Sequence, residues 1–259
     1  MVILVMTDGV RPDALDAVPC PTFDTLRAGG ASTLNARSVM PSVTLPCHMS
    51  IFHSVPPERH GITTNLYIPM ARPLPGLIET LHAAGKRSAL IHNWEPLRDI
   101  NRPETLAFSY YREPPNDHTF DDAVAAEGVA AITSGEFDFI FIYLGGVDIA
   151  GHVYGWMSDG YLTQLTHLDA ALGRITAAMP AHASIIVHSD HGGHERTHGT
   201  ESPEDMTIPW IAAGPPIHNG HTILGHVGLV DTAPTICRLL DVAPHPAWEG
   251  RVVHEIFTS

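Results

Sequence analysis

Cysteine, basic residues and long apolar runs are all scarce in this 259-residue sequence. The three cysteines are widely spaced and form no Cys-x-x-Cys pair, which argues against a disulfide framework and agrees with a reducing compartment. No apolar run approaches the roughly 20 residues that a bilayer span requires. The N-terminal "MVILVMTDG" lacks the basic start and the cleavage site of a secretory signal. We therefore expect a cytoplasmic protein without a membrane partner.

Basic side chains are too few to bind a polyanion. The sequence has 14 Lys and Arg against 28 Asp and Glu, a net charge of -14, and no Lys/Arg cluster offsets it. A field of that sign repels nucleic acid, so we expect no nucleic-acid polymer as a partner. The sequence also contains no Walker-type glycine loop and no Ser-His-Asp arrangement.

Apolar residues make up 44% of the chain, and short apolar runs alternate with longer amphipathic segments. This alternation predicts an α/β domain with a mostly parallel sheet. We predict strands over residues 2–6, 87–92, 137–144, 183–189 and 207–212. We predict helices over residues 21–28, 45–53, 76–84, 120–133, 158–179 and 230–240. The "GGAS" at 29–32 is interpreted as the turn that ends the first of these helices.

Three of the predicted strands run directly into acidic or histidine-rich loops. The strand at 2–6 leads to Asp8. The strand at 137–144 leads to Asp148 and His152, and the strand at 183–189 leads to Asp190 and His191. Open α/β sheets bind ligands beyond the carboxyl ends of their strands. We therefore expect these carboxylates and imidazoles to gather at one edge of the sheet.

The spacing of these residues suits metal ligation. Asp148 and His152 are four apart in "GGVDIAGH", so a helical turn places them on one face. Asp190 and His191 are adjacent, and an irregular loop lets both flank one ion. Mixed Asp and His ligation suits Zn²⁺ or Mn²⁺ better than Mg²⁺. Taken alone, each pair also fits a turn or cap without metal, and Asp8 alone fits an ordinary strand end.

A hydroxyl precedes the helix at 45–53. Either Ser42 or Thr44 in "MPSVTLPCHMS" is suited to cap this helix. A hydroxyl at a helix N-terminus also lies where backbone N–H groups favour an anion. With two metal ions nearby, Thr44 could act as the nucleophile of an in-line phosphoryl displacement.

The motifs together resemble the alkaline phosphatase superfamily, in its nucleotide pyrophosphatase/phosphodiesterase-like branch. The matching blocks are "VMTDGVRPD", "MPSVTLPCHMSIFHSVPPERHGITTN", "GGVDIAGH" and "SDHGGHERTHG", and they occur in family order between residues 2 and 199. The tail "DTAPTICRLLDV" is similar to the family's closing helix. Each block is weak alone, whereas the ordered set is specific. The resemblance implies a three-layer α/β/α sandwich with a mostly parallel central sheet and a minimal cap.

The resemblance also implies two metal sites and a nucleophile. Residue by residue, one site takes Asp148, His152 and a third histidine. The other takes Asp8, Asp190 and His191, with Thr44 as a nucleophile that touches the same ion. Asn65 matches the asparagine that helps to hold a non-bridging phosphate oxygen. The cofactors implied are two divalent ions, Zn or alternatively Mn.

The third histidine is not fixed by the sequence. We favour His198, which precedes glycine and a short run into a strand, as the family histidine does. His194 is flanked by charged residues that indicate exposure, and His226 in "GHVGLVD" is the best of the later candidates. Arg11 also matches a common family position, and we interpret it as structural, paired with a nearby carboxylate.

The length is short for the family. We expect one alkaline-phosphatase-like catalytic domain over 1–259, with any cap limited to 66–75 and 98–117. The second segment carries Phe108, Tyr110 and Tyr111, which would either stack on a nucleobase or aryl group or simply pack. The oligomeric state, the native metal and the physiological substrate stay open.

The function implied is hydrolysis of a small phosphorylated substrate, a phosphodiester or pyrophosphate, through a phospho-threonine intermediate. A phosphonate hydrolase of the phosphonoacetate type is the serious alternative, and a phosphomonoesterase is another. A sulfatase is disfavoured because Cys47 begins Cys-His-Met-Ser-Ile and not Cys-x-Pro-x-Arg. A cofactor-independent phosphoglycerate mutase would need a serine nucleophile and a large inserted domain. A non-catalytic zinc-binding protein is the alternative from another class.

Overall fold

The fold is built on one mixed β-sheet. The computed structural model describes residues 1–114 and 118–258. The strands are β1 (Val2–Thr7), β2 (Gly30–Arg37), β3 (Ser88–His92), β4 (Phe108–Tyr111), β5 (Phe139–Leu144), β6 (Ser184–His188), β7 (Thr207–Ala213) and β8 (His221–Thr222). They form an eight-stranded sheet in the order β4-β3-β5-β1-β6-β7-β2-β8. Neighbouring strands are parallel, except that β7 runs antiparallel to β6 and β2.

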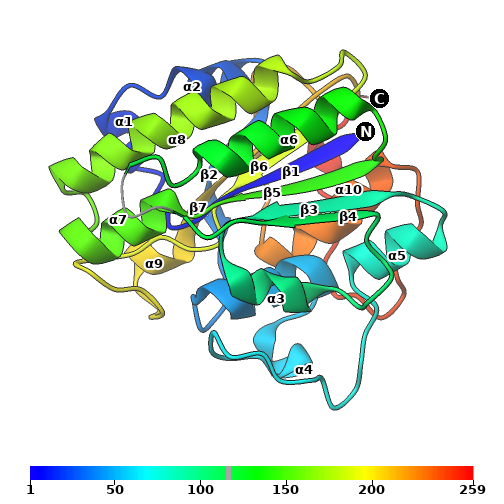
Figure 1. Cartoon of the computed structure of the whole chain (residues 1–259). Helices are drawn as coiled ribbons and strands as arrows, with labels where there is room; N and C mark the ends of the chain where they lie inside the picture. The colour runs from blue at the N-terminus through cyan, green and yellow to red at the C-terminus, as the bar shows by residue number, and fades with distance from the viewer. Residues whose placement is uncertain (115–117, 259) are drawn as a thin grey trace.

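Helices cover both faces of the sheet. The α-helices are α1 (Ala14–Ala17), α2 (Pro21–Ala28), α3 (Thr44–His53), α4 (Pro57–His60), α5 (Leu77–Ala83), α6 (Asp122–Ser134), α7 (Gly146–Tyr154), α8 (Asp159–Ala177), α9 (Pro203–Met206) and α10 (Thr232–Leu239). Short 3₁₀ turns add η1 (Glu95–Ile100), η2 (Leu229–Asp231) and η3 (His254–Ile256). Figure 1 shows α2, α6 and α8 above the sheet and α3, α5 and α10 below it.

The central strand, β1, shows why the buried strands are continuous apolar runs in the sequence. Val2, Leu4 and Met6 of β1 pack into the core on the α3, α5 and α10 side. Ile3 and Val5 pack into the core beneath α2, α6 and α8. Because helices cover both faces, neither set of alternating side chains faces water, and the strand carries no polar residue until Thr7. The predicted fold class, a three-layer α/β/α sandwich with a mostly parallel sheet, is confirmed.

Three strands were absent from the sequence prediction. The "GGAS" interpreted as a turn at 29–32 is wrong beyond its first residue, because Gly29 ends α2 and Gly30 already begins β2. β2 is a poor apolar run, since it mixes small and polar residues and is only partly buried. β4 is a short strand at one edge of the sheet, and β8 has only two residues at the other. Edge strands need fewer apolar side chains, so period and composition signal them weakly.

The two segments predicted as a small cap have different structures. Residues 66–75 are irregular and expose Leu66 and Ile68, and the Pro75 carbonyl accepts a hydrogen bond from Trp248 Nε1 (2.9 Å). Much of 98–114 belongs to the body of the fold, because it includes the end of η1 and all of β4. Residues 115–117 of the predicted segment lie outside the described residues. Within the part of the chain that the structure describes, no helix is long and apolar enough to cross a bilayer.

Candidate active site

Carboxylates from three neighbouring strands meet at one edge of the sheet. β1 lies between β5 and β6, and all three are parallel. Asp8 follows β1, Asp148 lies in the first turn of α7 after β5, and Asp190 lies just beyond β6. Gly9 allows the close approach, because its φ is 73° and a Cβ there would lie 2.9 Å from Cα of Asp148.

The first cluster consists of Asp8, Asp190 and His191. All three side chains are buried. His191 Nε2 lies 3.3 Å from Asp8 Oδ1 and 3.5 Å from Asp190 Oδ2. Thr44 Oγ1 lies 3.3 Å from the same nitrogen. The predicted nucleophile therefore borders this cluster directly.

The second cluster consists of Asp148, His152 and His198. Asp148 Oδ2 lies 3.6 Å from His152 Nε2, and Asp148 Oδ1 lies 3.6 Å from His198 Nε2. The two Nε2 atoms are 3.2 Å apart. Ligand atoms bound tetrahedrally about 2.0–2.1 Å from one zinc ion lie roughly 3.3 Å from each other. Both clusters thus have the spacing of ligands around a single ion.

The histidine rings are oriented by backbone carbonyls. In all three, Nδ1 lies within hydrogen-bond distance of a carbonyl oxygen, which leaves the Nε2 lone pair facing its cluster. These contacts join His152 to Arg196 (2.9 Å), His191 to Gly192 (2.8 Å) and His198 to Ser42 (2.8 Å). The rings of His191 and His198 stack with centroids 3.8 Å apart, so the two clusters touch. This orientation is the one that a metal-binding imidazole needs.

Each carboxylate has an oxygen without a hydrogen-bond partner. These buried atoms are Asp8 Oδ1, Asp148 Oδ1 and Asp190 Oδ2. Burial, followed by the charges of Asp190 and Asp148, raises the pKa of Asp8 well above its ordinary value. Burial above all raises the pKa of Asp190 to about 7, and it also raises the pKa of Asp148. Orphaned oxygens and mutual repulsion are what bound cations would relieve, so the residues fit two divalent ions.

Thr44 is the first residue of α3, and neither predicted hydroxyl caps this helix. The N-cap is Val43, which has no capping side chain, and Ser42 Oγ donates to the Thr200 carbonyl (2.9 Å). Asn65 supplies the missing acceptor, because its Oδ1 accepts a hydrogen bond from the Leu45 N–H (2.9 Å). This bond leaves the amide Nδ2 of Asn65 free to serve a ligand beside Thr44.

The sequence of this chain matches a known protein family. The family model described as type I phosphodiesterase / nucleotide pyrophosphatase matches residues 2–203. The chain belongs to this family. Membership confirms the resemblance seen in the motifs and indicates a phosphoester hydrolase.

Two solved structures resemble this phosphodiesterase family member over most of its length. The structure of a murine ectonucleotide pyrophosphatase/phosphodiesterase 5, an inactive variant in complex with AMP, has a TM-score of 0.82 at 17% identity and covers 99% of both chains. A phosphonate monoester hydrolase from Silicibacter pomeroyi has a TM-score of 0.74 at 17% identity, over 97% of this chain and 75% of that one. At such identities these likenesses show the fold.

A curated relative matches only in part. The 2,3-bisphosphoglycerate-independent phosphoglycerate mutase of Acinetobacter baylyi (strain ATCC 33305 / BD413 / ADP1) is 30% identical over 131 residues, which is 48% of this chain. The match spans 24% of the mutase, so the matched half of this chain corresponds to about a quarter of that relative.

Two residues beside the clusters were not predicted. Tyr143 was hidden inside the apolar run of β5, and its hydroxyl donates to Asp8 Oδ2. His48 lies one turn after Thr44 with Nδ1 2.7 Å from the Thr44 carbonyl, and burial lowers its pKa to about 3. Its ring packs edge-on against Tyr143, with centroids 5.4 Å apart. The spacing of His48 from Thr44, one helical turn, was the only signal available.

The other candidate residues lie outside the two clusters. His194 contacts Asp205 Oδ1 through Nδ1 (2.7 Å). His226 is exposed beside β8, and its backbone carbonyl accepts a hydrogen bond from Arg251. Arg11 forms a salt bridge with Asp13 (2.6 Å), in keeping with the structural interpretation. Among the described residues, His198 is thus the histidine that joins Asp148 and His152.

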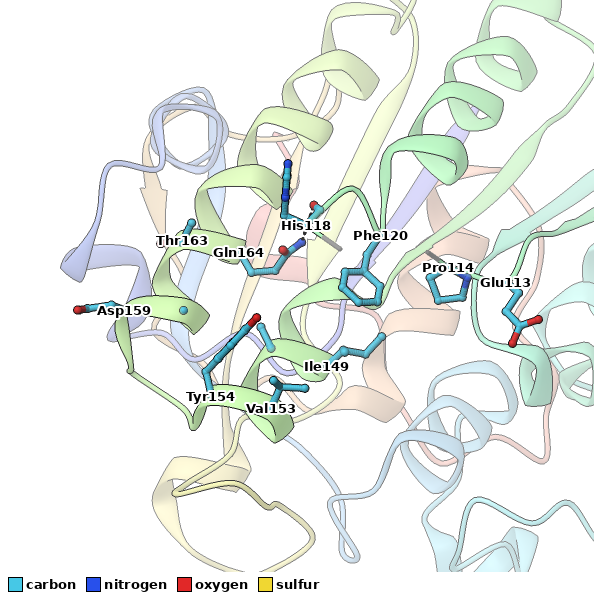
Figure 2. Close-up of a pocket in the computed structure, with 12 residues that line it drawn as sticks. Glu113, Pro114, His118, Phe120, Ile149, Val153, Tyr154, Asp159, Thr163 and Gln164 are labelled. Atoms are coloured by element: carbon cyan, nitrogen blue, oxygen red, sulfur yellow. Dashed lines mark hydrogen bonds between the residues drawn. The ribbon is translucent and has the colours of Figure 1, made fainter. Parts of the chain in front are cut away.

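A cavity of about 460 Å³ opens over the second cluster and Thr44. Thr44, Asn65, Tyr143, Asp148 and His198 lie on its floor and walls. A second, more apolar cavity of about 660 Å³ adjoins it and shares Ile149 and the Glu113–Pro114 segment. Figure 2 shows this second cavity between Phe120 and the outer face of α7, which carries Val153 and Tyr154. Substrate reaching Thr44 would enter through the first cavity.

Proposed function

We propose that the protein is a two-metal phosphodiester or pyrophosphate hydrolase that acts through Thr44, in a single catalytic domain with a small phosphorylated substrate. The observation that carries the proposal is the meeting of two three-ligand clusters beside the Thr44 hydroxyl. The ligand sets proposed are Asp8, Asp190, His191 and Thr44 for one ion, and Asp148, His152 and His198 for the other. Nitrogen and oxygen donors in these numbers suit Zn, with Mn as the alternative.

Bound at these clusters, the two ions would lower the pKa of the Thr44 hydroxyl and neutralise charge on the phosphate oxygens. The chain supplies the rest. Thr44 Oγ1 forms a bond to phosphorus, and the bond from phosphorus to the leaving oxygen breaks. Thr44 loses its proton in this step, and the leaving oxygen gains one.

Water then hydrolyses the covalent phospho-threonine, which for a diester still carries the retained ester group. Water forms the new bond to phosphorus, the bond to Thr44 Oγ1 breaks, and the hydroxyl regains a proton. Asn65 Nδ2 and the Thr44 N–H are the donors that would meet the negative charge that grows on a non-bridging oxygen, since the Leu45 N–H already bonds to Asn65 and Pro46 has no N–H. The Leu45 hydrogen bond fixes Asn65 beforehand, so little reorganisation is needed.

The charge of the cavity favours a diester over a monoester. The described lining residues include Glu95 and Glu113 and no Lys or Arg. A phosphomonoester carries a second negative charge that such a site leaves without a counter-ion. A phosphonate hydrolase would use the same ligands and nucleophile, so substrate preference has to distinguish it from a diesterase.

The test is turnover of three substrates by metal-loaded protein: bis-p-nitrophenyl phosphate, p-nitrophenyl phosphate and phosphonoacetate. We expect the diester to give the highest kcat/KM. Thr44→Ala should lose at least about a thousandfold in kcat, as expected when a covalent nucleophile is removed. The matched control is Thr63→Ala, an exposed threonine in the loop that carries Asn65, and it should retain activity.

The alternatives have distinct outcomes. Preference for phosphonoacetate or for the monoester would replace the diesterase assignment. If protein with two bound ions turned over none of the three, the enzyme proposal would be wrong and the chain would be a zinc-binding protein.

A further inference from the structure

His198 and a second contact of its cluster come from one irregular loop. This loop, called here the His198 loop, spans residues 192–202 between the end of β6 and α9. Besides His198 it supplies the Arg196 carbonyl, which lies 2.9 Å from His152 Nδ1 and orients that ring. Two of the three ligands proposed for the second cluster therefore depend on where this loop lies. None of its residues, all of which the structure describes, belongs to a helix or a strand, so contacts from outside have to hold it.

A tight turn in the His198 loop presents the Arg196 carbonyl. The backbones of His194 and Thr197 exchange two hydrogen bonds, each 2.9 Å long. Between them, Glu195 has a φ of 48°, in the left-handed region that favours glycine, so the turn is under some strain. The Glu195 carbonyl accepts a hydrogen bond from the Trp156 N–H (2.7 Å), just beyond α7. One side of the turn is thus held by the end of α7.

The buried carboxylate of Asp205 in α9 holds the other side. Its Oδ1 lies 2.7 Å from His194 Nδ1. Its Oδ2 accepts two hydrogen bonds from Thr200, one from the backbone N–H (2.8 Å) and one from Oγ1 (2.8 Å). His194 and Thr200 lie on either side of His198 in the sequence, so one side chain ties together the start and the end of the segment that carries this ligand. Asp205 is itself fixed, because its N–H donates to Ser202 Oγ at the N-cap of α9 (3.3 Å).

The charges of this pair strengthen the contact. The hydrogen bond to Asp205 is the largest influence on the pKa of His194 and raises it, and the charges of Glu195 and Glu204 act in the same direction. Burial acts to raise the pKa of Asp205, but the hydrogen bonds from His194 and Thr200 outweigh it and lower the pKa. Histidine and carboxylate therefore stabilise each other's charged form, and a charge-assisted hydrogen bond is roughly twice as strong as a neutral one.

This pair differs from an ordinary surface ion pair. Exposed pairs contribute little to stability, because water screens both partners. Here the His194 side chain is 31% exposed, whereas the Asp205 side chain is fully buried. The ring of His198 has other supports, since its Nδ1 contacts the Ser42 carbonyl and its face stacks on His191. Those contacts orient the ring, but a metal ligand also has to lie within about 0.5 Å of its productive position, which depends on the backbone of the loop.

We infer that His194 and Asp205 form a latch that holds the His198 loop where it can bind the second ion. Both are positioning residues, because neither belongs to a cluster of ligand atoms. The inference rests on the proposed function, since the second ion is part of that proposal. It also gives a role to His194, which the ligand sets leave unused.

Zinc titration of the metal-free protein tests the latch. Wild type should bind two ions, and Asp148→Asn, which removes a ligand of the second cluster, identifies the step of the titration that belongs to it. His194→Ala should weaken that step about tenfold, the lower end of the range for residues that support metal ligands, and leave the other step unchanged. His194→Asn should restore it to within about threefold of wild type, because the asparagine amide can donate to Asp205 from the place of Nδ1. A general loss of stability would weaken both steps and would not be rescued by asparagine.

Two further variants complete the test. Asp205→Asn should weaken the second-cluster step at least as much as His194→Ala, because an amide keeps one acceptor oxygen for donors on two residues. If Asp205→Asn does not fold, the two His194 variants decide, because that side chain is partly exposed. The matched control is His221→Ala in β8, at the edge of the sheet. His221 Nε2 lies 3.1 Å from Glu255 Oε1 and its side chain is 34% exposed, so its removal breaks a similar histidine–carboxylate pair and should change neither step.

The outcomes separate the latch from the proposed function. Unchanged binding in His194→Ala, equal weakening of both steps, or equal weakening in His194→Ala and His194→Asn overturns the latch and leaves the hydrolase standing. If wild type binds fewer than two ions, the proposed function fails, and amide hydrogen exchange of residues 194–200 in the metal-free protein decides about the latch. Faster exchange in His194→Ala than in wild type, restored by His194→Asn, supports it. Equal exchange in all three proteins, or no rescue by asparagine, overturns it.

Discussion

Asp190→Asn should stabilise the metal-free protein and destabilise the metal-bound protein. In the metal-free protein, Asp190 is fully buried, near Asp8 and Asp148, and its Oδ2 has no hydrogen-bond partner. Asp190→Asn keeps the shape and the acceptor oxygen while it removes the charge. The chelated variant should therefore be more stable than chelated wild type. With metal present, the lost ligand should make the variant less stable than wild type.

The size of the effect follows from the pKa of Asp190. Because burial raises it from 3.8 to about 7, the folded state holds its proton over a range where the unfolded state has lost it. This carboxyl costs nothing below pH 3.8, and its cost grows as pH rises and is complete above pH 7. At about 1.4 kcal/mol per pH unit, the full cost is about 4 kcal/mol, against about 2 kcal/mol at pH 5. In a chain of this size, 4 kcal/mol corresponds to roughly 10 °C in Tm.

Thermal melts of both proteins in chelator, from pH 5 to pH 8, measure this difference. Comparing the two at each pH cancels the titrating groups that do not interact with Asp190. The gain of Asp190→Asn should widen as pH rises, and excess zinc should reverse its sign. A variant that is equally destabilised with and without chelator, at every pH, would refute the reasoning, because Asp190 would then be an ordinary structural residue.

Two further results are expected. Gly192→Ala should lower zinc affinity, measured by zinc titration, and activity together. A Cβ at Gly192 would lie 2.0 Å from the Glu204 carbonyl oxygen and would displace the loop that carries His191. Unchanged zinc affinity would contradict this. Burial lowers the pKa of His188 to about 4, so its contribution to stability is complete above pH 6.5 and is lost as pH falls toward 4. His188→Gln should therefore lose less free energy of unfolding than wild type between pH 7 and pH 5 in urea titrations, and an equal loss would show that His188 does not titrate this way.

The strands that hold the site were predictable because they are covered on both sides. β1, β5 and β6 appear as continuous apolar runs, and an acidic residue after such a run has few structural explanations. β2 was missed for the opposite reason, since its partly buried sequence alternates small and polar residues. Its pairing with β7 depends on contacts about 180 residues apart, between Gly30 and Ala213, which no local pattern reveals.

The sequence predicted the types of residue at the site, but it did not predict the residues that hold them in place by hydrogen bonds. Spacing suggested that Asp148 and His152 share a helical face, and they do. The cap of α3 was assigned to Ser42 or Thr44, but Asn65 provides it from another loop. Tyr143 looked like one more apolar residue of β5, although its hydroxyl donates to Asp8. Hydrogen bonds of this kind join segments through the tertiary fold and leave no mark on local periodicity.

Mass spectrometry of protein quenched during turnover tests the central claim most directly. The account predicts that metal-loaded protein mixed with bis-p-nitrophenyl phosphate and quenched in acid carries one p-nitrophenyl phosphoryl group on Thr44. The adduct should be absent from Thr44→Ala and from chelated protein. Two results together would contradict a threonine nucleophile. One is steady turnover of the diester with Thr44 unmodified at every quench time, in wild type and in a variant such as Asn65→Ala. The other is undiminished turnover by Thr44→Ala.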